Sequence, residues 1–476
     1  MATHRYWLVF VMLVGCSGDA PDRSDAGMDA PPTEADPEQS GSRLKRRGHD
    51  IDGTKALDRI FDSARGETCL PRSWADGNSY CTPFENMGYV VSTDASCTTK
   101  VGFGYRGCMP AGPDYYAEYL DSECGEYAVK KVFSRGPERS ATQYYRVLSD
   151  GTCDGPVTLS PEEKLYTLGP EVPASALARL TETVAAGTHR LRQAYVESED
   201  GLRFATHVVD TSRAFECMWQ GDLESKSWAC IPGGAAYAGH YADASCSKRA
   251  AALPAGNCPV PAYVMHNDKP GCRAPSYSIY ETGAALGTVI HDDVGGVCTM
   301  HDLGSDVRVV AAGAPVDIAT PTRTLSGASA RVKRINATAE GDVFWMSSLR
   351  DEERQIDCVL AKATDGVTRC LPIGNYVQHY FRDAACTIPV DIARVYRGAA
   401  GCELLPKPTF ANSWIAATSS CDVRQQIHLI GAEVTAPLYA NYGECQPMSS
   451  PTVTFYELGP IVPPEDFAAA VPITEL

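Results

Sequence analysis

The segment Cys81-Thr82-Pro83, with Asp94-Ala95-Ser96-Cys97 downstream, determines how this chain is organised, because the pair of motifs occurs three times. The later copies are Cys230-Ile231-Pro232 with Asp243-Ala244-Ser245-Cys246, and Cys370-Leu371-Pro372 with Asp383-Ala384-Ala385-Cys386. The two cysteines are 16 residues apart in every copy. Self-similarity at a long, nearly constant period is the signature of a repeat protein. The sequence therefore predicts three copies of one structural unit.

All cysteines except Cys16 fall into these three units, six to a unit. The predicted disulfide cysteines are Cys69, Cys81, Cys97, Cys108, Cys124, Cys153, Cys217, Cys230, Cys246, Cys258, Cys272, Cys298, Cys358, Cys370, Cys386, Cys402, Cys421 and Cys445. The closest two, Cys97 and Cys108, are eleven residues apart, which excludes the spacing of a zinc knuckle or a haem-attachment motif. So many cysteines without metal-site spacing indicate disulfides made in an oxidising compartment.

The pairing of these cysteines does not follow from spacing, because six cysteines allow many connectivities. We expect neighbours along the chain to pair within each unit. Cys217 and Cys230, for example, flank Gly221–Ser225 almost symmetrically, which would bring their side chains together across a hairpin.

Short runs rich in Val, Tyr, Phe and Thr alternate with turn residues in every unit, which is the pattern of β-strands. Asp52-Gly53 is a hairpin-type turn, because both residue types tolerate positive φ. The chain is predicted to be all-β. Two four-stranded meanders per unit would give about six radial blades, a β-propeller, and the alternative is three tandem β-sandwich modules.

The joins between the units, Thr181–Gly187 and Thr320–Ser326, are short and unlike linkers, which favours one closed body. We place the repeats at residues 41–182, 183–325 and 326–476. Each opens with a basic segment whose alternating charges are typical of a solvated strand face. These segments are Arg43-Leu44-Lys45-Arg46, His189-Arg190-Leu191-Arg192 and Arg331-Val332-Lys333-Arg334.

Residues 1–16 have the features of a bacterial lipoprotein signal. The apolar run Tyr6–Val14 is too short to span a bilayer, and Leu13-Val14-Gly15-Cys16 looks like a lipobox. Cys16 is the predicted acylated residue, since its removal leaves an even number of cysteines. Acyl chains on Cys16 would anchor the protein to a membrane of the cell envelope.

The segment that follows Cys16 is acidic and rich in Pro. Residues 17–40 are predicted to form a disordered tether, because they have almost no large apolar side chains. Ser17, a residue other than Asp directly after the lipidated cysteine, favours the outer membrane.

Charge and motifs exclude several classes of function. The chain carries 59 acidic and 42 basic side chains, a net charge of −17, which argues against nucleic acid as a partner. The sequence contains no nucleophile elbow, HExxH motif, P-loop or dinucleotide fingerprint, so it identifies no catalytic residue, and we predict no cofactor.

Three sets of residues were the remaining candidates for a site. His291-Asp292-Asp293 with His301-Asp302 resembles a metal constellation, but solvated loops beside Cys298 are the favoured interpretation, and we predict no metal. For the repeated Asp94, Asp243 and Asp383 we favour capping of a turn over calcium binding or catalysis. Five tryptophans could stack on sugars, although packing is favoured: Trp74, Trp219, Trp228, Trp345 and Trp414.

A lipobox, an acidic tether and repeated Cys-Leu-Pro and Asp-Ala-x-Cys motifs together resemble the uncharacterised multi-cysteine repeat lipoproteins of myxobacteria, a domain of unknown function. The resemblance covers essentially the whole chain. It implies a place in the cell envelope and no assigned activity.

The function expected from the sequence is that of a non-catalytic binding or adhesion scaffold. Its ligand would be a glycan, a peptide or a protein, met by the loops of the β repeats. A secreted glycan-active hydrolase with a site at the propeller axis is one alternative, and a purely structural envelope protein is another.

Overall fold

The computed structural model describes residues 38–85, 87–105, 113–121, 127–148, 152–220, 228–255, 259–268, 276–294, 297–396, 407–416, 423–448 and 452–475. Strands account for 65% of the structure, and the described residues contain no α-helix, only the short 3-10 turns Ala174–Ala176 and Pro464–Asp466. The all-β prediction is confirmed. Within those residues no helix has the length and hydropathy that crossing a bilayer requires.

Each repeat has two halves, and the first half is a four-stranded antiparallel meander. Its strands are β1 (Leu44–Ile51), β2 (Thr54–Asp62), β3 (Glu67–Ser73) and β4 (Ser79–Pro83) in repeat 1, β13 (Leu191–Ser198), β14 (Arg203–Asp210), β15 (Phe215–Gln220) and β16 (Ala229–Pro232) in repeat 2, and β26 (Val332–Ala339), β27 (Asp342–Asp351), β28 (Ile356–Lys362) and β29 (Thr368–Pro372) in repeat 3. The first hairpin of repeat 1 turns at Asp52-Gly53, where both residues have positive φ, as predicted. Glu340-Gly341 does the same in repeat 3.

One joining strand connects each first half to the next. The joining strands are β12 (Arg179–Val184), β25 (Thr322–Ser326) and β37 (Val471–Thr474). β12 pairs with β4 of its own repeat and with β13 of the next repeat. Since β12 and β25 span the repeat boundaries drawn from the sequence, neighbouring repeats share a strand.

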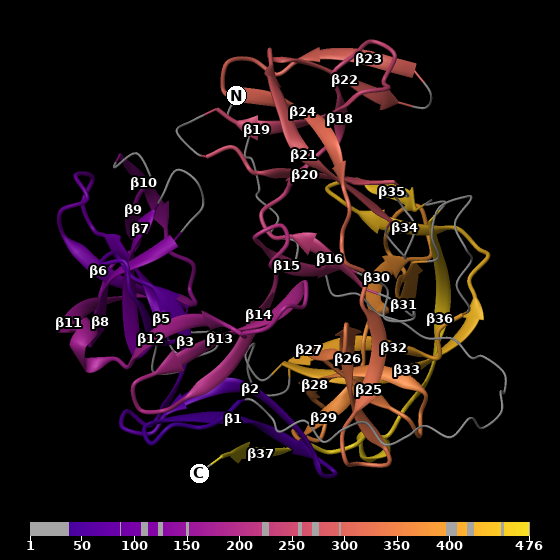
Figure 1. Ribbon diagram of the computed structural model, residues 1–476. Helices are drawn as coiled ribbons and strands as arrows, with labels where there is room; N and C mark the ends of the chain where they lie inside the picture. Colours follow the sequence, from indigo (N-terminus) through magenta and orange to yellow (C-terminus); the bar gives the residue numbers. More distant parts are fainter. Residues whose placement is uncertain are drawn as a thin grey trace.

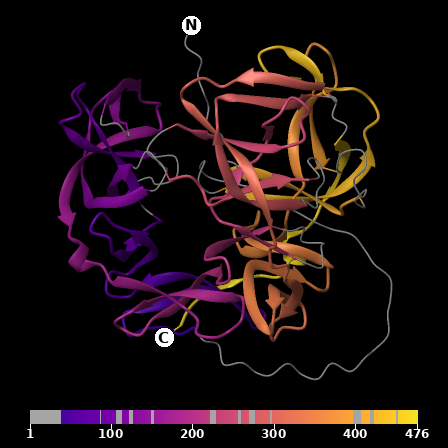
Figure 2. The ribbon, with the colours of Figure 1, turned by 45° about the horizontal axis from the view of Figure 1, so that its top comes forward.

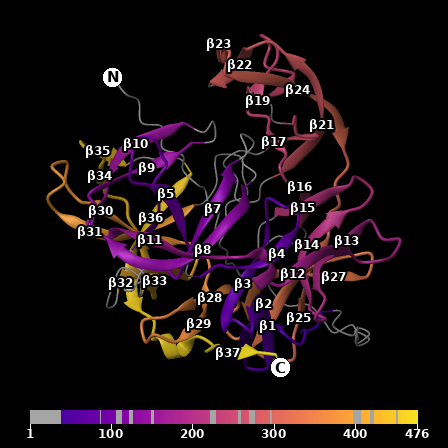
Figure 3. The ribbon, with the colours of Figure 1, turned by 90° about the vertical axis from the view of Figure 1, so that its left-hand side faces the viewer.

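The joining strands close the three first halves into a ring. The N–H groups of Cys81, Cys230 and Cys370 donate to the carbonyl oxygens of Ala178, Ala319 and Ala468, which precede the three joining strands. β37 then pairs with β1, so the last strand of the chain returns to the first. Figures 1 and 3 both show β37 beside β1 at one end of the molecule.

The second half of each repeat is a small curled sheet with a hairpin attached. Its strands are β5 (Met87–Ser92), β6 (Lys100–Tyr105), β7 (Tyr115–Asp121), β8 (Tyr127–Arg139), β9 (Gln143–Val147), β10 (Cys153–Thr158) and β11 (Glu163–Val172) in repeat 1, β17 (Ala236–Tyr237), β18 (His240–Tyr241), β19 (Arg249–Pro254), β20 (Tyr263–Asn267), β21 (Tyr277–Leu286), β22 (Val289–Val294), β23 (Val297–Asp302) and β24 (Val307–Val316) in repeat 2, and β30 (Tyr376–Phe381), β31 (Pro389–Tyr396), β32 (Phe410–Ala416), β33 (Val423–Glu433), β34 (Leu438–Asn441), β35 (Cys445–Met448) and β36 (Val453–Ile461) in repeat 3.

In repeat 1 the order β5-β6-β11-β8-β7 is closed by pairing between β7 and β5, which makes a five-stranded barrel. Repeat 3 closes in the same way through β30 and β31. Figure 1 shows the three second halves as separate lobes at the left, top and right of the view, and Figure 2 shows them rising from the layer of first halves.

Three hydrophobic cores lie where one first half meets the next. In the first, Ile60 and Cys69 of repeat 1 pack against Val196 and Phe204 of repeat 2. The second core joins repeats 2 and 3 in the same way. In the third, repeat 3 packs against Ile51 of repeat 1. Each first half is therefore covered by the leading hairpin of the next repeat.

These contacts correct both expected architectures. The strands form sheets of ten, seven, eight, five and seven strands, which do not divide into six four-stranded propeller blades. Tandem sandwiches fail as well, because each of the three cores between the first halves takes side chains from two repeats. The sequence pattern marks strands but not their long-range partners, and the shared joining strand is what sets the sheet order.

An arginine–aspartate pair, which we call the clasp, recurs in every first half. Arg43, Arg190 and Arg331 each contact an aspartate at the end of the second strand, at 2.6, 2.8 and 3.0 Å respectively. These aspartates, Asp62, Asp210 and Asp351, have almost no exposed side-chain surface. Arginine can present two parallel N–H groups to a carboxylate, which makes such a contact directional.

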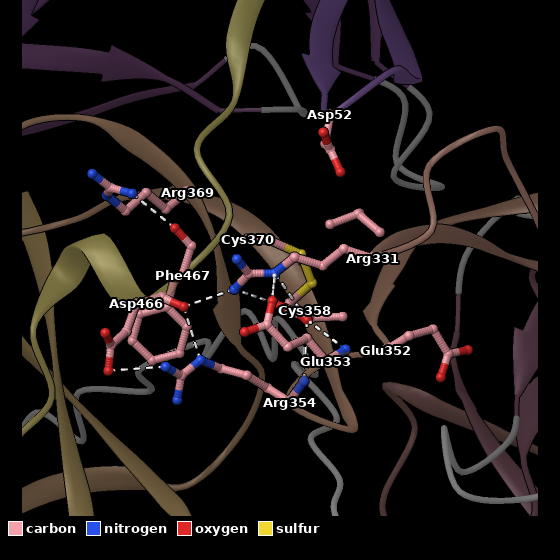
Figure 4. A network of polar contacts seen from close by, with 12 residues as sticks. Asp52, Arg331, Glu352, Glu353, Arg354, Cys358, Arg369, Cys370, Asp466 and Phe467 are labelled. Carbon is pink, nitrogen blue, oxygen red and sulfur yellow. Dashed lines mark hydrogen bonds and ion pairs between the residues drawn. A yellow bond between two sulfur atoms is a disulfide. The ribbon is translucent and has the colours of Figure 1, made fainter.

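The same guanidinium groups also hold the segment that returns from the second half. They donate to the carbonyl oxygens of Ala176, Asp317 and Asp466 at 2.9, 2.7 and 2.7 Å. Figure 4 shows the repeat 3 clasp, where Arg331 and Arg354 both reach Asp466 beside the Cys358–Cys370 disulfide. The prediction of a solvated face is thus wrong for the arginines of the clasp, because each is folded over its own meander.

Six disulfides link described cysteines, all within single repeats. The first and second cysteines pair as expected: Cys69–Cys81, Cys217–Cys230 and Cys358–Cys370. The third cysteine pairs with the sixth, in Cys97–Cys153, Cys246–Cys298 and Cys386–Cys445, so purely sequential pairing is wrong. The reason is that the hairpin carrying the sixth cysteine packs on the turn that carries the third.

Several predicted features lie outside the described residues. They are the lipobox with Cys16, most of the tether, and the fourth and fifth cysteines of each repeat: Cys108, Cys124, Cys258, Cys272, Cys402 and Cys421. The end of the predicted tether is described and packs on the body. Glu38 forms an ion pair of 3.0 Å with the buried Arg46, and Gln39 pairs with Arg203. Assigning residues 38–40 to a disordered tether is therefore wrong.

We predict that Asp351→Ala lowers the free energy of unfolding by about 3 kcal/mol, because it leaves Arg331 without its buried partner. The control is Glu353→Ala, which removes an exposed carboxylate from the same arginine and is expected to cost less than about 1 kcal/mol. Urea denaturation followed by circular dichroism measures both. Equal losses in the two variants would contradict a structural role for the clasp.

Removal of residues 471–476 should open the ring at β1, because β37 is the outer partner of Arg47–Asp50. We expect faster hydrogen exchange at these amides and a lower midpoint of thermal unfolding, since an exposed strand edge is left behind. Amides in the distant barrel strand β33 serve as the internal reference. Unchanged protection along β1 would mean that the ring does not depend on its last strand.

Candidate functional site

The repeated aspartates Asp94, Asp243 and Asp383 occupy equivalent turns in the three second halves. The carboxylate of Asp94 accepts the N–H groups of Thr98 and Thr99 at 3.2 and 2.6 Å. Asp243 and Asp383 each accept two N–H groups four and five residues downstream in the same way. These contacts agree with the predicted capping role.

The capped turn holds the third cysteine in an unusual backbone conformation. Cys97, Cys246 and Cys386 have φ values of 54°, 51° and 53°, in the left-handed region that side chains other than glycine rarely adopt. The N–H of each cysteine donates to the backbone carbonyl of its aspartate at 3.0, 3.0 and 3.1 Å. The aspartate thus shapes the turn from which the third cysteine reaches the hairpin.

Hydrogen bonds hold the pKa of each of these carboxyl groups below its usual value. The largest contribution comes from the hydroxyl of Ser96 at Asp94, of Ser245 at Asp243 and of Thr387 at Asp383, and backbone N–H groups add to it. A carboxylate that accepts several hydrogen bonds resists protonation.

The histidine–aspartate group of repeat 2 forms contacts within itself. Asp292 lies 2.6 Å from Nδ1 of His240 and 3.5 Å from Nε2 of His301. Among the described residues no group of three or more His, Cys, Asp or Glu side chains has an arrangement that could hold a metal ion. Both histidines contact Asp292 from neighbouring strands, since β22 pairs with β18 and with β23. The interpretation of these segments as solvated loops beside Cys298 is wrong, because they are the paired strands β22 and β23.

Four of the five tryptophans that we considered for sugar stacking pack in the interior. Trp74 and Trp228 are buried, and Trp219 and Trp345 pack against core clusters. Trp414 is the exception, since 52% of it is exposed on β32. The packing interpretation is confirmed for four residues and wrong for Trp414.

A groove on the barrel of repeat 1 is a concave surface lined by described residues. We call it the repeat 1 groove. Its volume is about 880 Å³, within the range of ligand pockets in proteins. It is lined by Arg72, Tyr89, Val90, Val91, Ser92, Ser96, Cys97, Lys100, Ala117, Glu118, Tyr119, Leu120, Lys130, Val147 and Leu148. These residues come from β3, from four strands of the barrel, from the turn that carries Cys97 and from the end of β9, so the groove lies where the first and second halves of repeat 1 meet.

Two tyrosines form the aromatic part of the groove. Tyr89 is 60% exposed, and the centroids of the Tyr89 and Tyr119 rings are 6.4 Å apart at an interplanar angle of 48°. The rings are held by neighbouring strands, since Tyr89 on β5 pairs with Ala117 on β7, two residues before Tyr119. Rigid exposed aromatic rings provide contact area at little cost in conformational entropy.

Charged side chains lie beside the tyrosines. Glu118 is shared by Lys100 and Lys130, at 2.9 and 3.0 Å. Burial opposes ionisation of Glu118, but the hydrogen bonds from the two lysines outweigh it, so the pKa of this carboxyl lies below its usual value. Arg72 is exposed and lies over the ring of Phe84, with 5.7 Å between the guanidinium carbon and the ring centroid.

The other two repeats keep part of this surface. Tyr237 and Tyr376 pair in parallel with the third barrel strand of their own repeats, as Tyr89 does in repeat 1. The same register places Asn267 and Trp414 at the position of Tyr119. Tyr237 and Trp414 are each 52% exposed. An exposed aromatic residue thus recurs on the barrels, whereas the charges beside it differ.

Apart from Ser96 and Cys97 of the repeated motif, the sequence did not single out the residues of the groove, because its walls are assembled from segments far apart in the chain. The available signal was the run of tyrosines in Tyr115–Asp121. Tyr116 of this strand is buried while Tyr119 reaches the groove, and the sequence alone does not distinguish the two.

The chain matches a family model over residues 24–467, described as a family of unknown function, DUF7481. No curated protein and no solved structure matches the chain.

We predict that Asp383→Asn lowers the midpoint of urea unfolding at neutral pH, because an amide accepts the turn's hydrogen bonds more weakly than a carboxylate. The folded-state pKa of Asp383 lies below the ordinary value of 3.8, so its stabilisation is present above pH 3.8 and is lost as the pH falls through the folded pKa. The difference between wild type and variant should therefore shrink in strong acid.

The matched control is Asp391→Asn, an exposed carboxylate of the same repeat that contacts His379. It should leave the unfolding midpoint nearly unchanged at neutral pH. An Asp383→Asn effect of constant size from pH 7 to pH 2 would contradict the assignment.

Proposed function

We propose that this chain, which belongs to the family of unknown function DUF7481, is a lipid-anchored binding protein of the bacterial cell envelope. In this proposal Cys16 carries the anchor, the acidic segment before residue 38 spaces the body from the membrane, and the β repeats act as a non-catalytic scaffold. The ligand is bound in the repeat 1 groove.

The observation that carries the proposal is the construction of the repeat 1 groove. It combines an exposed aromatic pair with cationic and anionic side chains, in a volume suited to a ligand segment. Its walls are rigid, because the barrel strands are closed on themselves and the Cys97–Cys153 disulfide borders the groove. Binding sites on rigid elements need little reorganisation when the ligand arrives.

The anchor is supported by the sequence and by the way the body begins. Residues 1–16 have the signal and lipobox pattern, and Glu38 and Gln39 then attach the chain to β1 and β14. The anchor thus leads into the layer of first halves, and the barrels rise from that layer as lobes (Figure 2). This arrangement leaves the groove of repeat 1 accessible to ligands.

Expression of the full chain in a bacterium with labelled palmitate tests the anchor. We expect the label to appear in the protein and to be lost in Cys16→Ser, because the thiol is the acyl acceptor. Ser17→Ala is the control and should keep the label. Labelling of Cys16→Ser to the wild-type level would contradict acylation at this position.

Retention of the detergent-solubilised full chain on arrays of glycans and peptides tests the binding function. We expect the double variant Tyr89→Ala/Tyr119→Ala to lose the retention shown by the wild type, because the aromatic surface of the groove is removed. Tyr237→Ala, an equally exposed tyrosine on repeat 2, is the control. Cleavage of array components, or equal retention of all variants, would contradict a binding scaffold that uses this groove.

A further inference from the structure

The charge of the repeat 1 groove is opposite to that of the whole chain. The chain has a net charge of −17, yet the groove is lined by Arg72, Lys100 and Lys130 against the single carboxylate of Glu118. Both lysines share that one carboxylate. Arg72 has no ion-pair partner among the residues that the structure describes, and its guanidinium instead lies over Phe84. The groove therefore carries an excess of positive charge in an acidic protein.

The tyrosines place flat apolar surface next to this charge. The Tyr89 and Tyr119 rings are exposed or partly exposed, and they lie among the same lining residues as the three cations. A pyranose ring has an apolar C–H face that packs on an aromatic ring, while its edge carries hydrogen-bonding groups. Aromatic rings flanked by hydrogen-bonding side chains are therefore suited to a saccharide.

The pairing of the strands disfavours an extended peptide in the same groove. A peptide that binds by strand addition needs an unpaired strand edge. At Tyr89, β5 pairs with Phe103 of β6 on one side and with Ala117 of β7 on the other. Because the backbone next to the aromatic pair is engaged on both sides, recognition there depends on side chains.

We propose that the repeat 1 groove binds an acidic polysaccharide, with the faces of its sugar rings on Tyr89 and Tyr119 and its carboxylate groups on the cations. This inference rests on the proposed binding function and names the class of its ligand. Arg72 binds one carboxylate through its paired N–H groups, since it has no acidic partner in the described part of the chain. Lys100 on β6 and Lys130 on β8, which both contact Glu118, bind a further acidic sugar.

Repeats 2 and 3 lack a cation at the position of Arg72. The spacing from the first cysteine and the strand register place Gln220 and Ala361 at the position of Arg72. Both side chains are uncharged, although Arg249 of repeat 2 keeps a cation at the position of Lys100. The cation without an acidic partner that the ligand requires is thus a feature of repeat 1.

Isothermal titration of the full chain in detergent micelles tests the proposal, with oligogalacturonate as the acidic probe. A neutral malto-oligosaccharide of equal length and a poly-glutamate peptide of equal charge are the comparison probes. We expect oligogalacturonate to bind at least tenfold more tightly than either. Arg72→Gln should weaken binding by about tenfold, as expected for one charge-assisted contact.

Tyr89→Ala/Tyr119→Ala should weaken the binding of oligogalacturonate by tenfold or more, while Tyr237→Ala should leave it within about twofold of the wild type. Far-ultraviolet circular dichroism of each variant checks that the barrel remains folded. A second readout is salt, since binding through the cations should weaken steeply as ionic strength rises.

Equal affinity for the neutral and acidic saccharides would overturn the charge inference while leaving the binding function in place. Tighter binding of poly-glutamate than of oligogalacturonate would overturn the saccharide in favour of an acidic peptide. Failure of oligogalacturonate to bind would also overturn the proposal. The array experiment above still decides whether the groove binds anything, so the two failures are distinguishable.

Discussion

The clasp between a guanidinium and a buried aspartate is the contact on which the rest of this structure depends. In every repeat the arginine holds the aspartate of its own meander and, through a third N–H, the carbonyl of the segment returning from the second half. That segment continues directly into the joining strand. The clasp therefore positions the strand by which each repeat reaches the next.

The clasp is also a costly contact to bury. An aspartate removed from water loses hydration, and only good geometry with further hydrogen bonds compensates for the loss. Asp351 meets both conditions, because its carboxylate also accepts the N–H groups of Glu353 and Arg354. The directional contact between Arg331 and Asp351 fixes how the returning segment lies on the meander, which apolar side chains would leave less defined. The burial of apolar surface comes instead from the three hydrophobic cores between the repeats.

Closure of the ring explains why three copies of the unit occur in one chain. A first half alone has an uncovered apolar face and two open strand edges. The next repeat covers the face with its leading hairpin, and the joining strand occupies the edge. Since β37 returns to β1, the third repeat needs no capping unit of its own. Stability is thus shared around the ring.

The features of the fold that could be predicted are those set by residues close together in the chain. The threefold motif, the β character, the Asp52-Gly53 turn and the capping aspartates all follow from residues within a few positions of one another. The pairing of the first two cysteines belongs with them, since Cys69 and Cys81 lie on adjacent strands of one meander. In these cases the chemistry of a short segment was enough to determine its structure.

The long-range features could not be predicted in this way. Cys97 pairs with Cys153, 56 residues away, because a hairpin folds back onto the Asp94 turn. Arg43 was taken for a solvated residue, because nothing in its neighbourhood reveals that Asp62 lies beneath it and that Ala176 returns to it. The groove escaped prediction for the same reason, since its walls come from seven segments of repeat 1.

The repeated frame and the single groove suggest how binding chemistry is distributed over the molecule. The capping aspartate and the disulfide between the third and sixth cysteines recur in the second halves. The clasp and the disulfide between the first two cysteines recur in the first halves, because closing the ring requires these halves to have the same shape. The barrels are free of this constraint, as they project from the ring. Position 72 is arginine in repeat 1, while its equivalents Gln220 and Ala361 are uncharged. Three barrels on one frame can therefore carry three different surfaces, and the cationic surface of repeat 1 is the one whose ligand chemistry the contacts define.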